Sequence, residues 1–211
     1  VLLKDILRNP IFDASEFEKL KLEMKSALEA NISEPQALVS EAIEKKTALY
    51  PKSHPYYSQT SDEKLVELNA ITLDDLKKYY NDFYNGSSSK IAFVGGLDKK
   101  NIKTFLAETF DNWNAKFTYT RIPTQYFEVD AYNNAIQVND KTNAIVLGKI
   151  NLNIGMNEPD YPAVEIANEL LGGGFLSSRL PQRLREAEGL SYGAGSFVSG
   201  NGIDKTGDWG V

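Results

Sequence analysis

Apolar residues in the first part of the chain recur at the spacing of one helix face, every three or four residues. Phe17, Leu20, Met24 and Leu28 are one such series. Residues that favour helix starts precede several of these runs: Asp13 with Glu16, Ser33 with Gln36, Thr72, and Asp98. The predicted helices cover residues 2–8, 16–30, 33–49, 62–68, 72–85 and 98–113.

The second part of the chain changes character, with segments that alternate or run apolar as β-strands do. Strands are predicted at 127–138, 144–152, 190–198 and 206–211, and one more at 90–94 in the first part. Asp160 and Pro162 open a helix that the Gly172–Gly174 run ends. A second helix begins at Ser177 or Ser178 and stops at Gly189. Both parts therefore mix helices with strands.

Composition narrows the function classes. The 211 residues carry a net charge of −6 and show no dense Lys/Arg patch, which argues against nucleic acid as a partner. There is no cysteine, so disulfides and thiol chemistry are excluded. No apolar run approaches the ~20 residues of a membrane span. Val1 begins inside a helical pattern and Val211 ends inside a strand pattern, so we expect a piece cut at both ends.

Candidate chemistry is sparse when the residues are taken by themselves. Val94-Gly95-Gly96 lies between a strand and a helix, but it lacks the G-x-G-x-x-G of a dinucleotide site and is interpreted as a tight turn. Gly172–Gly174 allows close backbone approach, and a helix end explains it without a ligand. His54 is the only histidine, whereas a hydrolytic zinc site needs about three protein ligands. We interpret it as a loop residue that packs on tyrosines.

Four stretches in the second part resemble a known signature. They are Asp160-Tyr-Pro-Ala, Asn168-Glu-Leu-Leu-Gly-Gly-Gly, Ser177-Ser-Arg-Leu and Leu184-Arg-Glu-Ala-Glu-Gly-Leu-Ser-Tyr192. Together they resemble the non-catalytic half of the pitrilysin/insulinase-type zinc metallopeptidases, the inverted zincins. Upstream segments agree in order: Arg8-Asn-Pro-Ile-Phe, His54-Pro-Tyr, Ile71-Thr-Leu-Asp-Asp-Leu, Ile91-Ala-Phe-Val-Gly-Gly-Leu-Asp and Phe110-Asp-Asn-Trp113. The likeness covers nearly the whole chain.

The resemblance implies an α+β fold of two related domains, each with helices packed on one face of a mostly antiparallel sheet. Residues 1–115 would be the later part of the first domain and 125–211 the early part of the second, with 116–124 as a linker. Both domains would be truncated in this chain.

The resemblance also implies a site. In the family the zinc is bound by H-x-x-E-H and a downstream helical glutamate, so zinc would be held by another segment and not by this chain. The helix 16–30 is similar to the one that bears this glutamate, but Ala27 occupies the matching position, with Glu23 and Glu29 nearby. Arg185 and Tyr192 match residues that reach into the zinc site from the non-catalytic half, and Gly172–Gly174 would let substrate backbone approach.

These matches predict a segment of a zinc-dependent endopeptidase that supplies the substrate-binding, non-zinc half of the cleavage chamber and is inactive alone. Its partners would be a peptide substrate and a catalytic half, on the same chain or on a partner subunit. The periplasm is favoured over the cytoplasm. The alternative is a catalytically inactive scaffold or assembly subunit that shares the peptidase fold.

Overall fold

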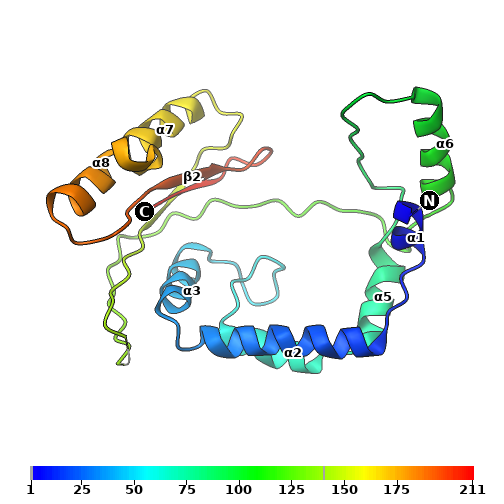
Figure 1. The fold of residues 1–211 in the computed structure, drawn as a ribbon, viewed down its shortest axis with the longest axis horizontal. Coiled ribbons are helices and arrows are strands. Elements are labelled where there is room, and N and C mark those ends of the chain that lie inside the picture. The colour runs from blue at the N-terminus through cyan, green and yellow to red at the C-terminus, as the bar shows by residue number, and fades with distance from the viewer. Residues whose placement is uncertain (1, 140) are drawn as a thin grey trace. The chain divides into compact units, whose positions relative to one another are not determined.

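The computed structural model describes residues 2–139 and 141–211, which form eight α-helices and one three-stranded antiparallel sheet (Figure 1). The predicted α+β class is confirmed. The chain groups into two compact units that are discontinuous in sequence. Unit 1 comprises the residues up to Ser26 and Leu65–Arg121, and unit 2 comprises Ala27–Lys64 and Ile122–Val211. The expected domains 1–115 and 125–211, with the linker 116–124, divide the chain differently and stay a prediction.

Unit 1 contains α1 (Leu2–Arg8), α5 (Leu73–Phe83), α6 (Lys99–Phe110) and parts of α2 (Ala14–Asn31) and α4 (Ser61–Ala70). An aromatic cluster around Trp113 joins α5 to α6, and Tyr80, Tyr84 and Phe110 all contact its ring. The Arg8 guanidinium lies 5.3 Å from the centre of the Trp113 ring. It also donates to the Thr109 carbonyl at 3.2 Å, so α1 is tied to the end of α6.

Most of the predicted helix starts are confirmed. Thr72 and Asp75 form a reciprocal capping box at α5, and the Asp98 carboxylate accepts from the Lys100 N–H at α6. Asp13 likewise accepts from the Glu16 N–H at the start of α2. The Ser33 prediction is wrong: α3 (Pro35–Thr47) begins after Glu34, and no side chain caps it. Proline in the first turn needs no N–H partner, which explains why this start does without a cap.

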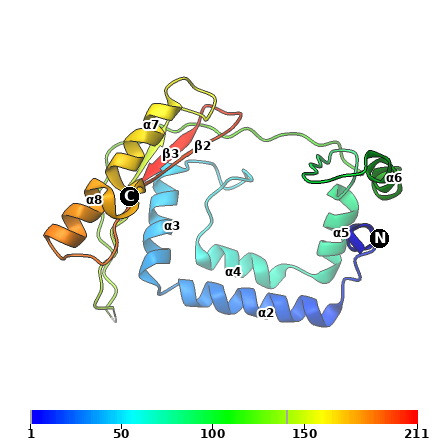
Figure 2. The same ribbon diagram turned by 45° about the horizontal axis from the view of Figure 1, so that its top comes forward.

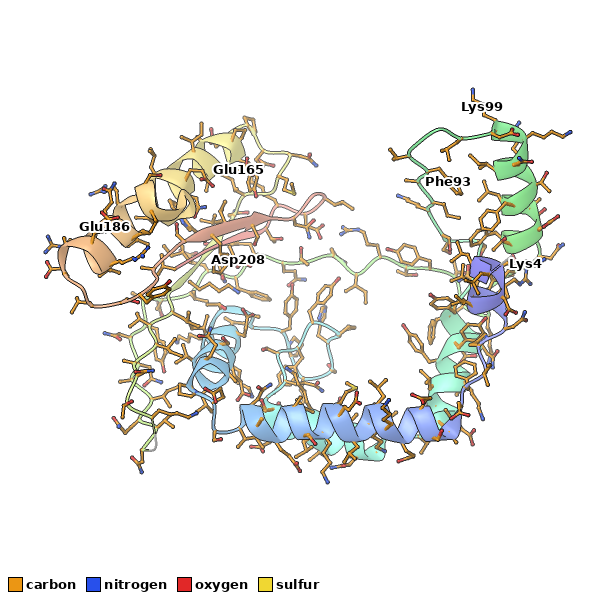
Figure 3. All side chains as sticks on the ribbon, viewed as in Figure 1. Lys4, Phe93, Lys99, Glu165, Glu186 and Asp208 are labelled. Carbon is orange, nitrogen blue, oxygen red and sulfur yellow. The ribbon has the colours of Figure 1, made fainter. Side chains whose placement is uncertain are left out.

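The strand predicted at 90–94 is also wrong, because this segment is irregular and largely exposed. Phe93 is labelled in Figure 3. Its ring contacts the Phe105 ring of α6 edge-on, with 6.4 Å between ring centres. Val94 is 97% exposed. A strand needs a neighbouring strand for its backbone hydrogen bonds. The other described elements of unit 1 are helices, so this apolar run has no such neighbour.

The sheet lies in unit 2 in the order β1-β3-β2, with β1 (Lys149–Leu152), β2 (Phe197–Gly200) and β3 (Gly207–Gly210). Both outer strands run antiparallel to β3, and Gly210 pairs with Lys149 on one side and Phe197 on the other. β1 and β3 lie inside the strands predicted at 144–152 and 206–211 but are shorter, and β2 shares only Phe197 and Val198 with the strand predicted at 190–198. The strand predicted at 127–138 is wrong, because the described sheet contains only β1, β2 and β3 and this segment pairs with none of them.

Helices cover both faces of this sheet (Figure 2). On one face, Gly200 of β2 lies so close to α7 (Tyr161–Asn168) that an added Cβ would fall 2.5 Å from the Tyr161 ring. On the other face, the Lys149 amine forms ion pairs with Glu44 of α3 at 2.9 Å and with Asp208 at 3.3 Å. Asn151 adds a hydrogen bond to the Thr47 carbonyl. Helix α7, which follows residue 125 in the chain, lies on one face of the sheet as expected. Helix α3 covers the other face.

A further contact network anchors the segment that leads from unit 1 into the sheet region of unit 2. The Asp204 carboxylate accepts hydrogen bonds from the N–H and the hydroxyl of Thr124. The Asn201 amide donates to the same hydroxyl at 3.1 Å.

None of the helices in the described part of the chain is long and apolar enough to cross a membrane.

We expect Thr72→Ala to lower the free energy of unfolding by about 1 kcal/mol, because it removes the α5 cap. The matched control is Ser33→Ala, which removes an exposed hydroxyl that caps nothing. Urea denaturation followed by circular dichroism measures both. Equal losses in the two variants would contradict this assignment of the helix starts.

The Glu63 carboxylate supplies a test at acid pH. It accepts from the Thr60 N–H and pairs with Lys52 and Lys45, and these contacts lower its pKa from 4.5 to about 2. Because the pKa of Glu63 is lower in the folded chain than its ordinary value of 4.5, the ionised carboxylate stabilises the fold at pH values above about 4.5. This stabilisation is lost as the pH falls from about 4.5 towards 2. Urea midpoints measured between these limits should fall less steeply for Glu63→Gln than for the parent chain. The control is Glu18→Gln, at an exposed position of α2, whose urea midpoint should fall with pH as steeply as that of the parent chain.

Candidate functional site

The glycine-rich run lies where α7 ends in unit 2. After Asn168 the helix widens into a π-helical segment, Glu169–Gly173, and the run closes it as predicted. Such segments are rare and occur frequently at functional sites. Gly172 is buried, and an added Cβ would lie 2.4 Å from the Ser196 nitrogen and 2.8 Å from the Gly195 carbonyl carbon. The lack of a side chain thus lets the helix end touch the backbone that leads into β2.

The other two glycines have milder packing constraints. An added Cβ on Gly173 would meet the Asn168 and Glu169 side chains, and one on Gly174 would meet the Glu169 carbonyl. Helix ending and close packing therefore account for the whole run. The substrate-binding role of Gly172, Gly173 and Gly174 stays a prediction.

A second helical segment follows and carries the predicted arginine. Ser178 precedes α8 (Arg179–Pro181) in the N-cap position, although its hydroxyl makes no capping bond. The helix continues as a second π-helical segment, Gln182–Ala187, and Gly189 leaves it with a φ of +62°. A left-handed φ favours glycine, so the predicted stop at Gly189 is confirmed. In Figure 3, Glu165 marks α7 and Glu186 marks the segment that carries Arg185.

The structure brings Arg185 and Tyr192 together. The guanidinium carbon lies 5.2 Å from the centre of the Tyr192 ring, a cation–π contact worth about 0.5–1 kcal/mol at an exposed site. Tyr192 is 91% exposed and Arg185 is half-buried. In the part of the chain that the structure describes, no carboxylate lies within ion-pair distance of Arg185. The neighbouring Arg183 instead pairs with Glu188 at 2.6 Å.

This arrangement leaves two hydrogen-bond donors at the surface. A phenol O–H and a guanidinium both donate to carbonyl or carboxylate oxygens, and the guanidinium also supplies positive charge. The cation–π contact holds the Tyr192 ring against Arg185 without using the phenol hydroxyl. The pair can therefore contact an anionic or carbonyl oxygen brought to this surface.

The described residues do not fit a zinc ion. Among them no group of three or more His, Cys, Asp or Glu side chains is placed to hold a metal. The single histidine, His54, stacks on Tyr50 with 4.4 Å between ring centres and accepts from the Tyr56 N–H. The interpretation of His54 as a loop residue that packs on tyrosines is confirmed.

Sequence reasoning missed the cluster around Lys149. Its side chain is only 14% exposed and lies between Glu44 and Asp208, beside a cavity of about 430 Å³ that Tyr50 and Asn151 also line. The three charged residues are far apart in the sequence, so only the fold reveals the cluster. Their mutual pairing is consistent with a structural role between α3 and the sheet.

Comparison with known proteins identifies similar chains. Residues 70–211 match the family described as "Peptidase M16 inactive domain". An uncharacterized zinc protease, YmxG of Bacillus subtilis (strain 168), is 26% identical over 199 residues, which are 94% of this chain and 46% of that protein. This chain therefore spans about half the length of that relative.

Two solved structures share the fold. One is a peptidase M16 inactive domain from Pseudomonas fluorescens, with a TM-score of 0.72, 24% identity, and coverage of 99% of this chain and 49% of that one. The other is a protease from Helicobacter pylori, with a TM-score of 0.63, 18% identity, and coverage of 94% and 47%.

The close contact at Gly172 predicts a specific cost. Gly172→Ala should lower the free energy of unfolding by about 1–3 kcal/mol, because the added methyl overlaps the Gly195–Ser196 backbone. Gly193→Ala is the matched control, since an added Cβ there meets nothing within 4 Å. Chemical denaturation of both variants checks the prediction. A Gly172→Ala variant as stable as Gly193→Ala would contradict it.

Proposed function

This chain belongs to the peptidase M16 family, and we propose that it supplies a non-zinc, substrate-binding part of a zinc-dependent endopeptidase. The matched family description, "inactive domain", and the relation to a zinc protease support this proposal. Zinc is held by another segment, on the same chain or on a partner subunit. The substrate is a peptide, and this chain alone does not cleave it.

The observation that carries the proposal is the Arg185–Tyr192 pair. The guanidinium carbon lies 5.2 Å from the centre of the tyrosine ring, and the tyrosine is almost fully exposed. Other tyrosines of this chain are exposed as well, so exposure alone assigns no role. What supports the proposal is the combination: a phenol O–H and a guanidinium lie side by side at the surface, and both can donate to a carbonyl or carboxylate oxygen.

The chemistry of peptide cleavage gives each donor a role. Attack on the scissile carbonyl moves negative charge onto its oxygen, and the Tyr192 O–H donates a hydrogen bond to that oxygen. Arg185 holds the ring in place and donates to a carbonyl or carboxylate oxygen of the bound peptide. Both residues stabilise or position the substrate, and neither one transfers a proton or forms a covalent bond.

In the complete peptidase, Tyr192→Phe should lower kcat by about 10²–10³ with a smaller change in KM, because the lost bond forms mainly in the transition state. Arg185→Ala should reduce kcat and raise KM, since the guanidinium also contacts the ground-state peptide. Steady-state kinetics on a fluorogenic peptide measure both variants.

Matched controls lie in the same unit. Tyr132→Phe alters another exposed tyrosine beneath a cation, with Lys46 5.0 Å from its ring centre, and Arg183→Ala alters the neighbouring arginine. Both controls should keep the parent kinetics. Thermal melting of each variant separates loss of activity from loss of fold. Full kcat/KM in Tyr192→Phe and Arg185→Ala would reject the proposed site.

A further inference from the structure

Helix α7 turns one polar side chain towards the sheet of unit 2. The buried residues of this helix and of the π-helical turn after it are Tyr161, Asn168 and Gly172, which form one stripe at helical spacing. Asparagine is uncommon at a buried position, because its amide needs hydrogen-bond partners. Asn168 is only 6% exposed, yet its Oδ1 atom accepts no hydrogen bond from any described residue. A buried acceptor of this kind requires an explanation.

A buried donor lies on the same face of the sheet. The Nε1 atom of Trp209 is buried, and no described residue accepts its hydrogen. Trp209 of β3 pairs with Val198 of β2, so the two side chains point to the same face. Gly200, two positions after Val198, shares this face and approaches the Tyr161 ring of α7. The indole of Trp209 therefore lies on the face that α7 covers.

The buried acceptor and the buried donor also lie at the same level along this interface. α7 runs antiparallel to β2, because its start meets the end of that strand and Gly172, past its own end, meets Ser196. Asn168 lies one helical turn, about 6 Å, before Gly172. Val198 lies two strand positions, about 7 Å, after Ser196. Asn168 is therefore level with Val198, the residue that pairs with Trp209.

A third polar group lies beside this position. The Ser196 hydroxyl donates to the Asn168 carbonyl at 3.3 Å, and its oxygen still has lone pairs that can accept hydrogen bonds. The Asn168 and Trp209 side chains form no hydrogen bond with each other. Both are satisfied only by a molecule that accepts a hydrogen from the indole and donates one to the amide oxygen.

We propose that one water molecule is bound between α7 and the sheet, where it accepts from the Trp209 Nε1–H and donates to the Asn168 Oδ1 and Ser196 Oγ atoms. Buried waters in proteins typically make about three hydrogen bonds, to polar groups that otherwise have no partner. Water is also the smallest molecule that accepts and donates at the same time. The site links α7 to β3 and to the segment that leads into β2.

The bound water fixes the point at which α7 widens. Asn168 immediately precedes the π-helical segment Glu169–Gly173, and Ser196 lies on the segment between Tyr192 and β2. A water that bonds to both residues holds the end of the helix against the segment that carries the proposed tyrosine. Only this consequence rests on the proposed function, because the water site itself requires no substrate.

A double-mutant cycle measures whether Asn168 and Trp209 act together. Asn168→Leu removes the acceptor with little change in side-chain volume. It should raise the unfolding equilibrium constant roughly tenfold, because the polar groups that remain lose a hydrogen-bonded link. In a Trp209→Phe background this effect should shrink by about threefold or more, because the link is already broken. The control background is Trp113→Phe, in unit 1, where the effect should be unchanged. Urea denaturation followed by circular dichroism measures every variant.

Nuclear magnetic resonance on the parent chain tests the water directly and needs no variant to fold. The indole N–H of Trp209 should show a nuclear Overhauser cross-peak to water, with the sign expected of a bound molecule. Asn168→Leu should weaken this cross-peak and leave the Trp113 indole signal unchanged. Neither measurement requires peptidase activity, so the proposal succeeds or fails independently of the proposed function.

Three results would overturn the proposal. An Asn168→Leu variant as stable as the parent would show that the amide has no partner. Equal effects of Asn168→Leu in the Trp209→Phe and Trp113→Phe backgrounds would show that the two groups are independent. Coupling without a water cross-peak would mean that the two side chains bond directly.

Discussion

Unit 2 depends on the pairing of one central strand with two neighbours that are distant in sequence. β3 holds β1 and β2 in register, and each outer strand meets a different helix. Lys149 and Asn151 of β1 contact α3, while Gly200 of β2 lies against Tyr161 of α7. The pairing of the central strand with both neighbours therefore determines how the helices cover the sheet.

A second constraint, the close contact at Gly172, lies near the proposed site formed by Arg185 and Tyr192. Gly172 touches the Gly195–Ser196 backbone, so the end of α7 is fixed against the segment that leads into β2. Arg185 and Tyr192 come from the two sides of the turn at Gly189, which brings the chain from the helical segment back towards the sheet. Gly172 therefore fixes the end of α7 against the segment that connects Tyr192 to β2.

The sequence predicted best what local chemistry decides. The caps at Thr72 and Asp98 depend on residues within one turn, and so does the stop at Gly189, which needs a positive φ. Predictions of strands were less reliable, because a strand needs a neighbouring strand for its backbone hydrogen bonds. Residues 90–94 have the composition of a buried strand but have no strand to pair with, and residues 127–138 form no strand either. Arg185 and Tyr192 were named from family resemblance, and the contact between them comes from the structure. The Lys149 cluster joins residues from three elements and has no local signal.

Two explanations of the exposed Tyr192 ring differ in what they require of its hydroxyl. Arg185 contacts the ring as a cation, so the position of the ring needs no ligand. A cation–π contact uses the face of the ring, and a phenylalanine at this position would keep it. Under the proposed function the phenol hydroxyl donates to the bound peptide, and phenylalanine would lose that bond. The hydroxyl is therefore the group that separates a ring that only packs against Arg185 from a side chain that meets substrate.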